Sequence, residues 1–327
     1  MRVTARTVWT FARLVADDGN EGWGEASLEG RSAEVEAAIR AFRLPIELGA
    51  IPADLVNAAA YSAVEQALWD LRARTAGQPL AEILGGARRE SVPLYANINR
   101  GTTDRSPGGF AARAAEAVAL GFGAIKIAPF DNMAQGYARI GAAADAIAGR
   151  AELQVDCHWR FDEARAQEAL AECARLGVTW FECPLPETPE HFAAIKRLRG
   201  KANAAGMRLA GAEQFIGVAG FRPLLEQGLY DVVMPDVKYA GGLAECLRIA
   251  ALAADHGVAC SLHNPSGPIC HAHSVHASAA MESKERLEYQ HGETPLFYEI
   301  APGLAAPSAG SAALPGPIRI DVLRKDL

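Results

Sequence analysis

The sequence predicts an α/β fold in which parallel strands and helices alternate as a (β/α) barrel. One observation is a change of pattern at about residue 91, where short β-branched or apolar runs begin to alternate with alanine-rich amphipathic stretches. A second is that a polar or charged residue stands at the end of each run. Because a barrel carries its active site at the carboxyl ends of its strands, these residues are candidates for one shared site.

The segment before this repeat, residues 1–87, has a mixed α and β pattern. Residues 3–17 have the composition of strands, and the following DDGNEG, residues 17–22, predicts a turn. Residues 59–77 carry apolar side chains at helical spacing and predict a helix. We therefore expect a hairpin and a long helix ahead of the repeat.

Eight strand candidates follow, and each is separated from the next by a stretch long enough for a helix. This arrangement fits a barrel better than an open sheet. The candidates are residues 92–97, 124–128, 152–156, 178–182, 207–213, 231–236, 258–263 and 286–290. Beyond about residue 291 the chain is rich in Pro and Gly and reads as loop, and IRIDVL at 318–323 predicts a strand that returns to the first segment.

The composition is that of a soluble globular protein, with 50% hydrophobic and 22% charged residues and a formal net charge of −7. Lys and Arg are scattered, so nothing indicates nucleic-acid binding. The six cysteines form no CxxC pair, which predicts reduced thiols in a cytoplasmic protein. No uncharged apolar run reaches the roughly 18 residues that a membrane span requires, and the start of the chain has no signal-peptide pattern.

Three acidic residues stand at matched places, about one β/α unit apart. Asp156 follows the apolar run LQV, Glu182 follows VTWF, and Glu213 follows MRLAGA. A single acid at such a place is an ordinary solvated loop residue, but three in series predict carboxylates gathered at one rim of a barrel. Three gathered carboxylates repel one another unless a cation lies between them, and their oxygen atoms suit a hard ion such as Mg²⁺.

Several further motifs occur in a fixed order along nearly the whole chain. They are GWGEAS at 22–27, the helical stretch 63–86, the lysine of AIKIAPFD, VDCHWRF, FECPLPE, GAEQ, DVVMPDVKYAGGL and CSLHNPSGP. Each motif alone is weak, but together and in this order they resemble the enolase superfamily, in its mandelate racemase and sugar-acid dehydratase branch.

The resemblance implies a (β/α)₇β TIM-like barrel over residues 88–290 and an α+β capping domain built on residues 1–87, to which residues 291–327 return. It also implies that Mg²⁺ is held by the three acids described above and binds the carboxylate of a small-molecule substrate. The family pattern is removal of the proton next to that carboxylate through an enediolate. Family members form homo-oligomers, so we expect one here.

The same resemblance implies a catalytic dyad of Asp236 and His263, in which the aspartate orients the imidazole. A histidine beside a carboxylate titrates near neutrality, as a general base should. His158 lies two residues after Asp156, and a D-x-H at this place is similar to galactonate and mannonate dehydratases, where the histidine protonates the departing hydroxyl. Read alone, either histidine would be a structural residue at a strand end.

Lys126 is expected beside the metal-bound carboxylate as a positive charge. Racemases and cycloisomerases of the group carry K-x-K at this strand end, whereas this chain reads Lys126-Ile127-Ala128. A 1,1-proton transfer needs a base on each face of the carbon, so the missing second lysine favours a dehydratase.

Four further residues are predicted to bind substrate. Glu288 ends the eighth strand, where the resemblance implies a donor to the substrate carboxylate, which requires a protonated side chain with a raised pKa. Asn99 and Arg100 follow the first strand and could hold a distal group of the substrate, and Arg160 could line the pocket.

We therefore predict a Mg²⁺-dependent dehydratase of a sugar acid that eliminates the β-hydroxyl and yields a 2-keto acid. The alternatives are a racemase, an epimerase or a lactone cycloisomerase on the same scaffold, and a catalytically inactive relative. The capping segment ahead of GWGEAS is shorter than in the family, so the sequence leaves the particular acid open.

Overall fold

The computed structural model describes residues 1–43 and 46–321. The first part of the chain forms an antiparallel hairpin, with Phe11 paired to Glu25, followed by helices. Its elements are β1 (Phe11–Val15), β2 (Glu21–Glu25), α1 (Ser32–Ala41), α2 (Leu55–Ala76) and α3 (Leu80–Ile83). The hairpin, its turn and the long helix were all predicted from the sequence.

The main sheet contains eight parallel strands in the order β10-β3-β4-β5-β6-β7-β8-β9. They are β3 (Ser91–Asn97), β4 (Ala124–Ile127), β5 (Glu152–Asp156), β6 (Val178–Glu182), β7 (Arg208–Gly211), β8 (Val232–Val233), β9 (Ala259–Cys260) and β10 (Leu287–Gln290). The connecting helices are α4 (Pro107–Ala119), α5 (Met133–Ile147), α6 (Glu163–Arg175), α7 (Phe192–Ala204), α8 (Gly217–Glu226), α9 (Leu243–Asp255) and α10 (Pro268–Ala280). A 3₁₀ turn, η1 (Pro189–His191), leads into α7, and the short α11 (Leu296–Glu299) follows β10.

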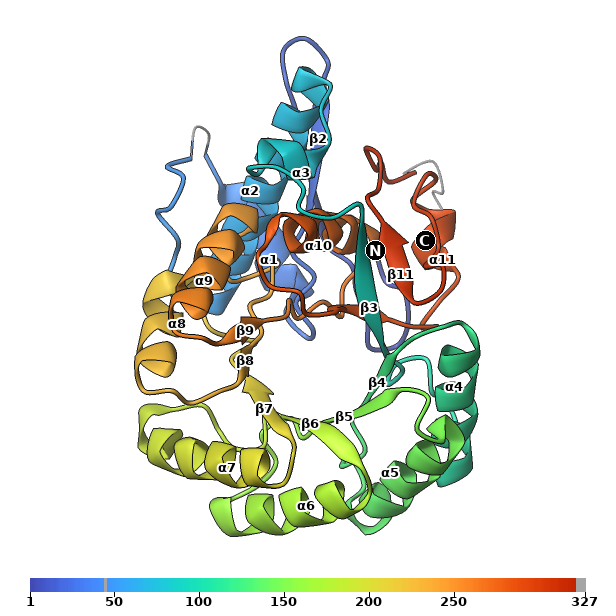
Figure 1. Ribbon diagram of the computed structural model, residues 1–327. Helices are drawn as coiled ribbons and strands as arrows, with labels where there is room; N and C mark the ends of the chain where they lie inside the picture. The colour runs from blue at the N-terminus through green and yellow to red at the C-terminus, as the bar shows by residue number, and fades with distance from the viewer. Residues whose placement is uncertain (44–45, 322–327) are drawn as a thin grey trace.

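The sheet curls round on itself, and helices α4 to α9 lie on its outer side (Figure 1). Within the described residues no ladder joins β9 to β10. Side chains bridge these two edges instead: Ser261 Oγ donates to Arg286 O at 2.8 Å, and Asn264 Nδ2 donates to Glu288 O at 2.9 Å. The eight predicted strands are all present in the predicted order.

Three strands are clearly shorter than predicted. β7 covers only Arg208–Gly211 of the run 207–213. Only Val232–Val233 of the run 231–236 and Ala259–Cys260 of the run 258–263 belong to the ladder. Pro235 has no N–H to donate, so the regular ladder stops before it. Backbone pairing continues irregularly, with His263 N donating to Pro235 O at 3.2 Å.

The C-terminal part differs from the prediction. Ser311–Ala313, expected to be loop, forms β11 and pairs antiparallel with β3. Residues 318–321 of the predicted strand IRIDVL form no strand, and residues 322–323 of it lie outside the described residues. This segment does return to the first part of the chain, because Arg74 on α2 donates to Ile318 O and both Ile318 and Ile320 are buried.

Two acids of the first segment fix it to the main sheet. Glu25 on β2 accepts from Gly267 N at 2.7 Å and from Cys270 N at 3.0 Å, at the start of α10. Glu65 on α2 accepts from Leu243 N at 2.8 Å and Ala244 N at 3.0 Å, at the start of α9. Both carboxylates therefore lie at the positive end of a helix dipole and bond amides that have no partner within the helix.

The glycines of the GWGEAS motif are required by close packing. A Cβ on Gly24 would lie 1.9 Å from Ala63 O, and one on Gly22 would lie 2.0 Å from Ala67 O. These carbonyls belong to α2, so the helix can lie directly on β2 only because both positions lack a side chain.

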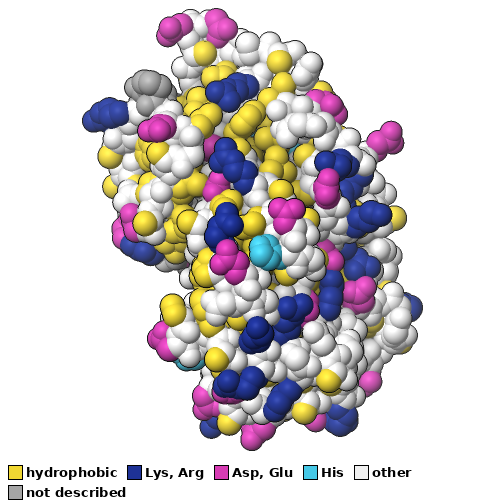
Figure 2. Space-filling view, turned by 60° about the vertical axis from the view of Figure 1, so that its left-hand side comes forward, with side chains coloured by type: hydrophobic (Ala, Val, Ile, Leu, Met, Phe, Trp, Pro, Cys, Tyr) yellow, Lys and Arg dark blue, Asp and Glu magenta, His cyan; other side chains and the backbone are white. Residues whose placement is uncertain are grey.

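Surface charge on the face drawn in Figure 2 is mixed, with basic and acidic side chains interspersed. None of the described helices has the length and hydropathy of a membrane span.

Replacing Gly24 by Ala is expected to destabilise the protein by roughly 1–3 kcal/mol, because β2 and α2 must move apart. The measurement is the free energy of unfolding from urea titration. Gly200→Ala on α7 is the matched control, since nothing lies within 4 Å of its added Cβ, and we expect it to stabilise by about 0.4–1 kcal/mol. Equal midpoints for the two variants would contradict the packing argument.

Stability is also expected to fall in acid through three histidines on α10. Burial lowers the pKa of His271 to about 4, of His273 to about 3 and of His276 to about 4, from 6.5. The unfolded chain therefore binds more protons, and the stabilisation present above pH 6.5 is lost as the pH falls toward 3–4, by up to about 1.4 kcal/mol per pH unit for each histidine.

Thermal unfolding between pH 7 and pH 5 measures this loss. His271→Phe should make the pH dependence shallower, whereas His256→Gln, at an exposed site after α9, should leave it unchanged. If the melting temperature varied with pH equally in the wild type and in His271→Phe, the loss of stability in acid could not be assigned to His271.

Candidate metal and acid–base site

Three acids meet at the carboxyl ends of neighbouring strands. Asp156 ends β5, Glu182 ends β6, and Glu213 follows β7 by two residues. The parallel register pairs Asp156 directly with Glu182. All three are buried, and one carboxylate oxygen from each lies within 4.8 Å of the other two. The sheet therefore gathers the three acids that the sequence singled out.

The backbone around these acids is unusual. Non-glycine residues with positive φ follow each of the three strands: His158 (49°), Trp159 (55°), Cys183 (45°) and Ala212 (72°). Each such residue costs roughly 1–3 kcal/mol and persists only where its surroundings fix it. Hydrogen bonds between the strand ends do so here, with Cys183 N donating to Ala210 O at 3.0 Å and Trp159 N donating to Cys183 O at 2.6 Å.

Each acid has a basic neighbour. Lys126 Nζ lies 2.7 Å from Glu182 Oε1, His158 Nε2 lies 2.9 Å from Asp156 Oδ2, and His263 Nε2 lies 3.3 Å from Glu213 Oε2.

These pairs shift the pKa values of the site. Burial raises the pKa of Glu182 to about 8, although Lys126 opposes this. Burial also resists ionisation of Asp156, but the positive charge of His158 outweighs it and lowers the pKa to about 2. The charge of Asp156 in turn raises the pKa of His158 to about 9. The described arrangement therefore favours a protonated His158, which is the form that can donate a proton.

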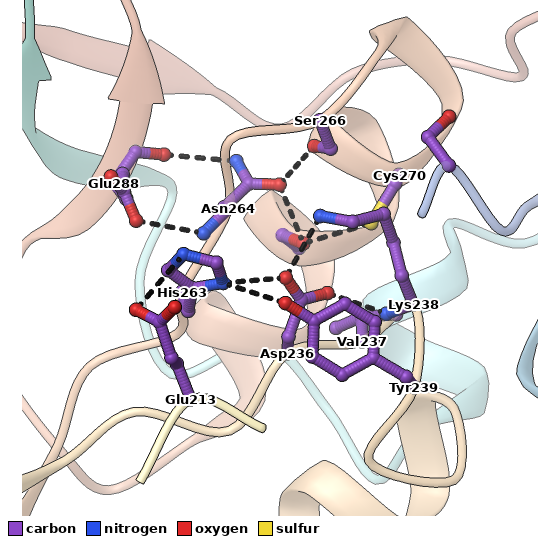
Figure 3. Close-up of polar contacts among 12 residues, drawn as sticks. Glu213, Asp236, Val237, Lys238, Tyr239, His263, Asn264, Ser266, Cys270 and Glu288 are labelled. Atoms are coloured by element: carbon purple, nitrogen blue, oxygen red, sulfur yellow. Dashed lines mark hydrogen bonds and ion pairs between the residues drawn. The ribbon is translucent and has the colours of Figure 1, made fainter. Parts of the chain in front are cut away.

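The dyad residues lie on the loops after β8 and β9 (Figure 3). His263 Nδ1 is 2.7 Å from Asp236 Oδ2, and its Nε2 faces Glu213. Lys238 Nζ donates to the same Asp236 oxygen at 2.8 Å, and Tyr239 Oη lies 3.2 Å from His263 Nδ1. Because Asp236 accepts at Nδ1, Nε2 is the ring nitrogen that faces the carboxylate cluster.

The charges around the dyad act in opposite directions on its two members. Burial opposes ionisation of Asp236, but Lys238 and His263 lower its pKa. Burial disfavours a charged His263, but the carboxylates of Glu213, Glu288 and Asp236 raise its pKa above the usual value.

Lys126 and Glu288 form a buried ion pair with 2.7 Å between Nζ and Oε1. Asn97 Nδ2 also donates to this oxygen at 2.6 Å, and Asn264 N donates to Oε2 at 3.0 Å. Burial opposes ionisation of Glu288, but Lys126 and His263 lower its pKa to about 2. Glu288 in this arrangement is therefore an ionised acceptor, and the donor role that the resemblance implies would require it to be protonated.

Lys126 keeps its charge as well. Burial alone would lower its pKa, but Glu182 and Glu288 raise it well above the usual value. Its ammonium group is held between two carboxylates, which suits a fixed positive charge and not a base.

The remaining candidates lie at the edge of this cluster. Asn99 Nδ2 donates to Asn97 Oδ1 at 2.8 Å, and its own Oδ1 accepts from Ala128 N, so Asn99 links the ends of β3 and β4. Arg100 is directed at acids outside the cluster, 3.1 Å from Glu29. Arg160 is exposed in the turn after β5. Their substrate-binding roles stay predictions.

The donor set fits a divalent cation. Three carboxylates supply only oxygen ligands, the preference of Mg²⁺ and similar hard ions. Oε2 of Glu213 is buried without a hydrogen bond of adequate geometry, although His263 Nε2 lies 3.3 Å away. A buried oxygen that lacks such a bond is available to a cation.

Sequence reasoning missed one buried ion pair and one acid near the cluster, and it left Lys238 open as an ion-pair or a rim residue. Lys238 is buried and pairs with Asp236. The pair that was missed, Lys126 with Glu288, joins residues far apart in the chain. Glu187, in the FECPLPE motif, has both carboxylate oxygens bonded beside the site. Of these contacts, only the pair of Lys238 with Asp236 was indicated by the sequence, because the two residues stand two positions apart.

A curled parallel sheet with helices outside and a carboxylate cluster at its strand ends defines the class of protein. Residues 109–317 match the family model described as enolase C-terminal domain-like, and residues 46–85 match the N-terminal domain of the mandelate racemase / muconate lactonizing enzyme family. The chain belongs to this family within the enolase superfamily, as its motifs predicted.

Among curated relatives, D-gluconate dehydratase of Thermoproteus tenax is 32% identical over 304 residues, which cover 85% of this chain and 60% of that protein. The chain thus spans less than two thirds of that relative. D-galactonate dehydratase of Variovorax paradoxus (strain S110) is 28% identical over 325 residues, covering 89% of this chain and 82% of the relative.

Solved structures share the fold. The 3,6-anhydro-D-galactonate cycloisomerase from Zobellia galactanivorans superimposes with a TM-score of 0.85 at 24% identity, covering 98% of this chain and 96% of that one. A mandelate racemase/muconate lactonizing enzyme-like protein from Roseovarius sp. TM1035 gives a TM-score of 0.83 at 23% identity, with 96% and 88% covered.

Addition of Mg²⁺ is expected to raise the melting temperature of the wild type, because a cation relieves the repulsion among the buried carboxylates. When the free Mg²⁺ concentration is about a hundred times the dissociation constant, the free energy of unfolding should rise by about 2.7 kcal/mol. Glu213→Gln should lose most of this gain in a thermal shift titration. Glu190→Gln, the same change at an exposed site after β6, should keep it. A full Mg²⁺ response in Glu213→Gln would argue against the site.

Proposed function

We propose that this protein is a Mg²⁺-dependent dehydratase of a sugar acid. Family membership and the sugar-acid dehydratase relatives indicate an enzyme, and among enzymes a lyase. The observation that carries the finer proposal is the placement of two histidines, His158 and His263, against the same cluster of three buried carboxylates.

In this proposal Asp156, Glu182 and Glu213 hold Mg²⁺. When bound, the ion supplies a positive charge that holds the substrate carboxylate and stabilises the negative charge developing there as the α-proton leaves. The chain contributes a dry site, because the three acids are all buried and a low dielectric strengthens each charge interaction.

His263 is the proposed base. Its Nε2 faces the cluster, and Asp236 accepts from Nδ1 at 2.7 Å, which fixes the tautomer and stabilises the imidazolium formed when the proton arrives. Lys238 bonds the aspartate at 2.8 Å, and Tyr239 Oη lies 3.2 Å from Nδ1 of the histidine, so both members of the pair have a further neighbour.

His158 is the proposed acid. Its Nε2 lies 2.9 Å from Asp156 Oδ2 at the edge of the cluster, where its ring can donate the proton that a departing hydroxyl needs. Its side chain is 44% exposed, which leaves room for a substrate over the ring. Loss of the hydroxyl would give an enol that becomes a 2-keto acid.

Lys126 favours dehydration over racemisation. A racemase needs a base on each face of the carbon, but this lysine is a charged group fixed by two carboxylates, and Ala128 stands where a second lysine would. The proposed role of Lys126 is electrostatic: its ammonium adds positive charge beside Glu182.

The proposal extends to the architecture. We interpret the curled sheet as a (β/α)₇β barrel over residues 88–290, with residues 1–87 as a cap and residues 291–327 returning to it. The two family matches, 46–85 and 109–317, fall on either side of the proposed boundary at residue 88. A cytoplasmic location and a homo-oligomer stay predictions.

The test is a keto-acid screen of purified protein with Mg²⁺ and a panel of aldonic, uronic and aldaric acids, detected with semicarbazide. We expect one or a few aldonic acids to react. His263→Asn should reduce kcat by at least roughly 100-fold, because the general base is lost. His256→Asn is the control at an exposed site.

Silence across the panel in a protein that binds Mg²⁺ would argue against dehydration. Incorporation of solvent deuterium into recovered substrate would then identify a racemase or epimerase, and loss of a lactone would identify a cycloisomerase. A protein that binds neither metal nor acid would be an inactive relative.

A further inference from the structure

Glu187 lies on the loop between β6 and α7, five residues after Glu182, and it bonds with three other parts of the chain. Its Oε1 accepts from Ala212 N at 2.6 Å and from Tyr230 Oη at 2.6 Å. Its Oε2 accepts from Trp159 Nε1 at 3.0 Å. One half-buried carboxylate thus joins the ends of β5, β6 and β7 to the residues just before β8.

The bond to Ala212 acts on a strained residue. Ala212 has a φ of 72° and directly precedes the proposed ligand Glu213. The amide that Glu187 accepts belongs to this same residue, so the bond fixes the direction in which the chain presents Glu213. Glu187 can come this close to the backbone only because residue 211 is a glycine. A Cβ on Gly211 would lie 2.5 Å from Glu187 Oε1 and 2.8 Å from the ring of Tyr230.

The bond to Trp159 acts on a second strained turn. Trp159 and His158 both have positive φ, and His158 contacts the proposed ligand Asp156 through its backbone N–H and its ring. The indole is held at Nε1 by Glu187 and its backbone by Cys183 O at 2.6 Å. The same carboxylate therefore supports the turn that carries Asp156 and His158.

Glu187 is not itself part of the carboxylate cluster, which consists of Asp156, Glu182 and Glu213. Its two oxygens already accept from three donors. A carboxylate can accept at both ends, whereas the amide of a glutamine has one accepting oxygen and would direct its NH₂ at a donor. An acid is therefore the side chain that this position requires.

We propose that Glu187 is a positioning residue that sets the affinity of the metal site by fixing the two strained strand ends on either side of Glu182. The inference rests on the metal site of the proposed function. Groups that orient metal ligands typically change metal affinity by 10–100-fold when they are replaced.

The experiment is isothermal titration of the purified protein with Mn²⁺ and with Mg²⁺, without substrate. Glu187→Gln and Glu187→Ala are each expected to weaken binding by 10–100-fold. Trp159→Phe, which keeps an aromatic ring but removes the indole N–H that Glu187 accepts, should give a smaller loss in the same direction. Glu190→Gln, in the adjoining turn η1 and exposed, should bind as the wild type does.

Melting temperatures measured without metal separate positioning from general destabilisation. The inference is supported if Glu187→Gln remains folded, with a melting temperature near that of the wild type, and binds metal more weakly. If Glu187→Ala fails to fold, Glu187→Gln still decides the question, because it keeps the volume of the side chain nearly unchanged.

Two results would overturn the inference, and they differ in what else they affect. Wild-type affinity in a folded Glu187→Gln would overturn it and leave the proposed metal site intact. A wild type that binds neither cation would overturn both the metal site and the inference.

Discussion

The constraint on which the site depends is the burial of three like charges at neighbouring strand ends. The register of the parallel sheet pairs Asp156 with Glu182, so these two acids cannot move apart without breaking the ladder. Glu213 follows the neighbouring strand β7 by two residues. The charge of the three acids is offset by Lys126, His158 and His263. The side chains that make the cluster electrostatically tolerable are thus the same ones to which we assign proton transfer and charge stabilisation.

A second set of contacts connects this rim to the first part of the chain. Glu25 and Glu65 bond the first amides of α10 and α9, the helices that follow the loops bearing His263 and Asp236. A buried carboxylate at a helix start supplies two acceptors and a favourable charge. The first part of the chain therefore fixes the helices that follow the loops bearing Asp236 and His263. The glycines of GWGEAS serve this arrangement by letting α2 approach β2.

Many of the strands that carry the site could be predicted from the local sequence alone. The runs ending in Asp156 and Glu182 have the predicted strand bounds, because alternation and β-branched content report directly on buried strands. The runs containing Asp236 and His263 were predicted too long, since the ladder stops before Pro235. The strand at 311–313 was missed because its few residues pair only through contact with β3, which the local sequence cannot reveal.

The sequence by itself determined which side chains end the strands and in what order, and with that the three acids, the dyad residues and the family. Only the tertiary structure decided the partners: Lys126 with Glu288, Lys238 on Asp236, Glu187 beneath two strained turns, and Arg100 directed at Glu29. The physical reason is that alternation along a strand fixes the face on which a side chain lies. Its neighbour on that face, and hence its charge state, is set by residues brought close only when the sheet curls.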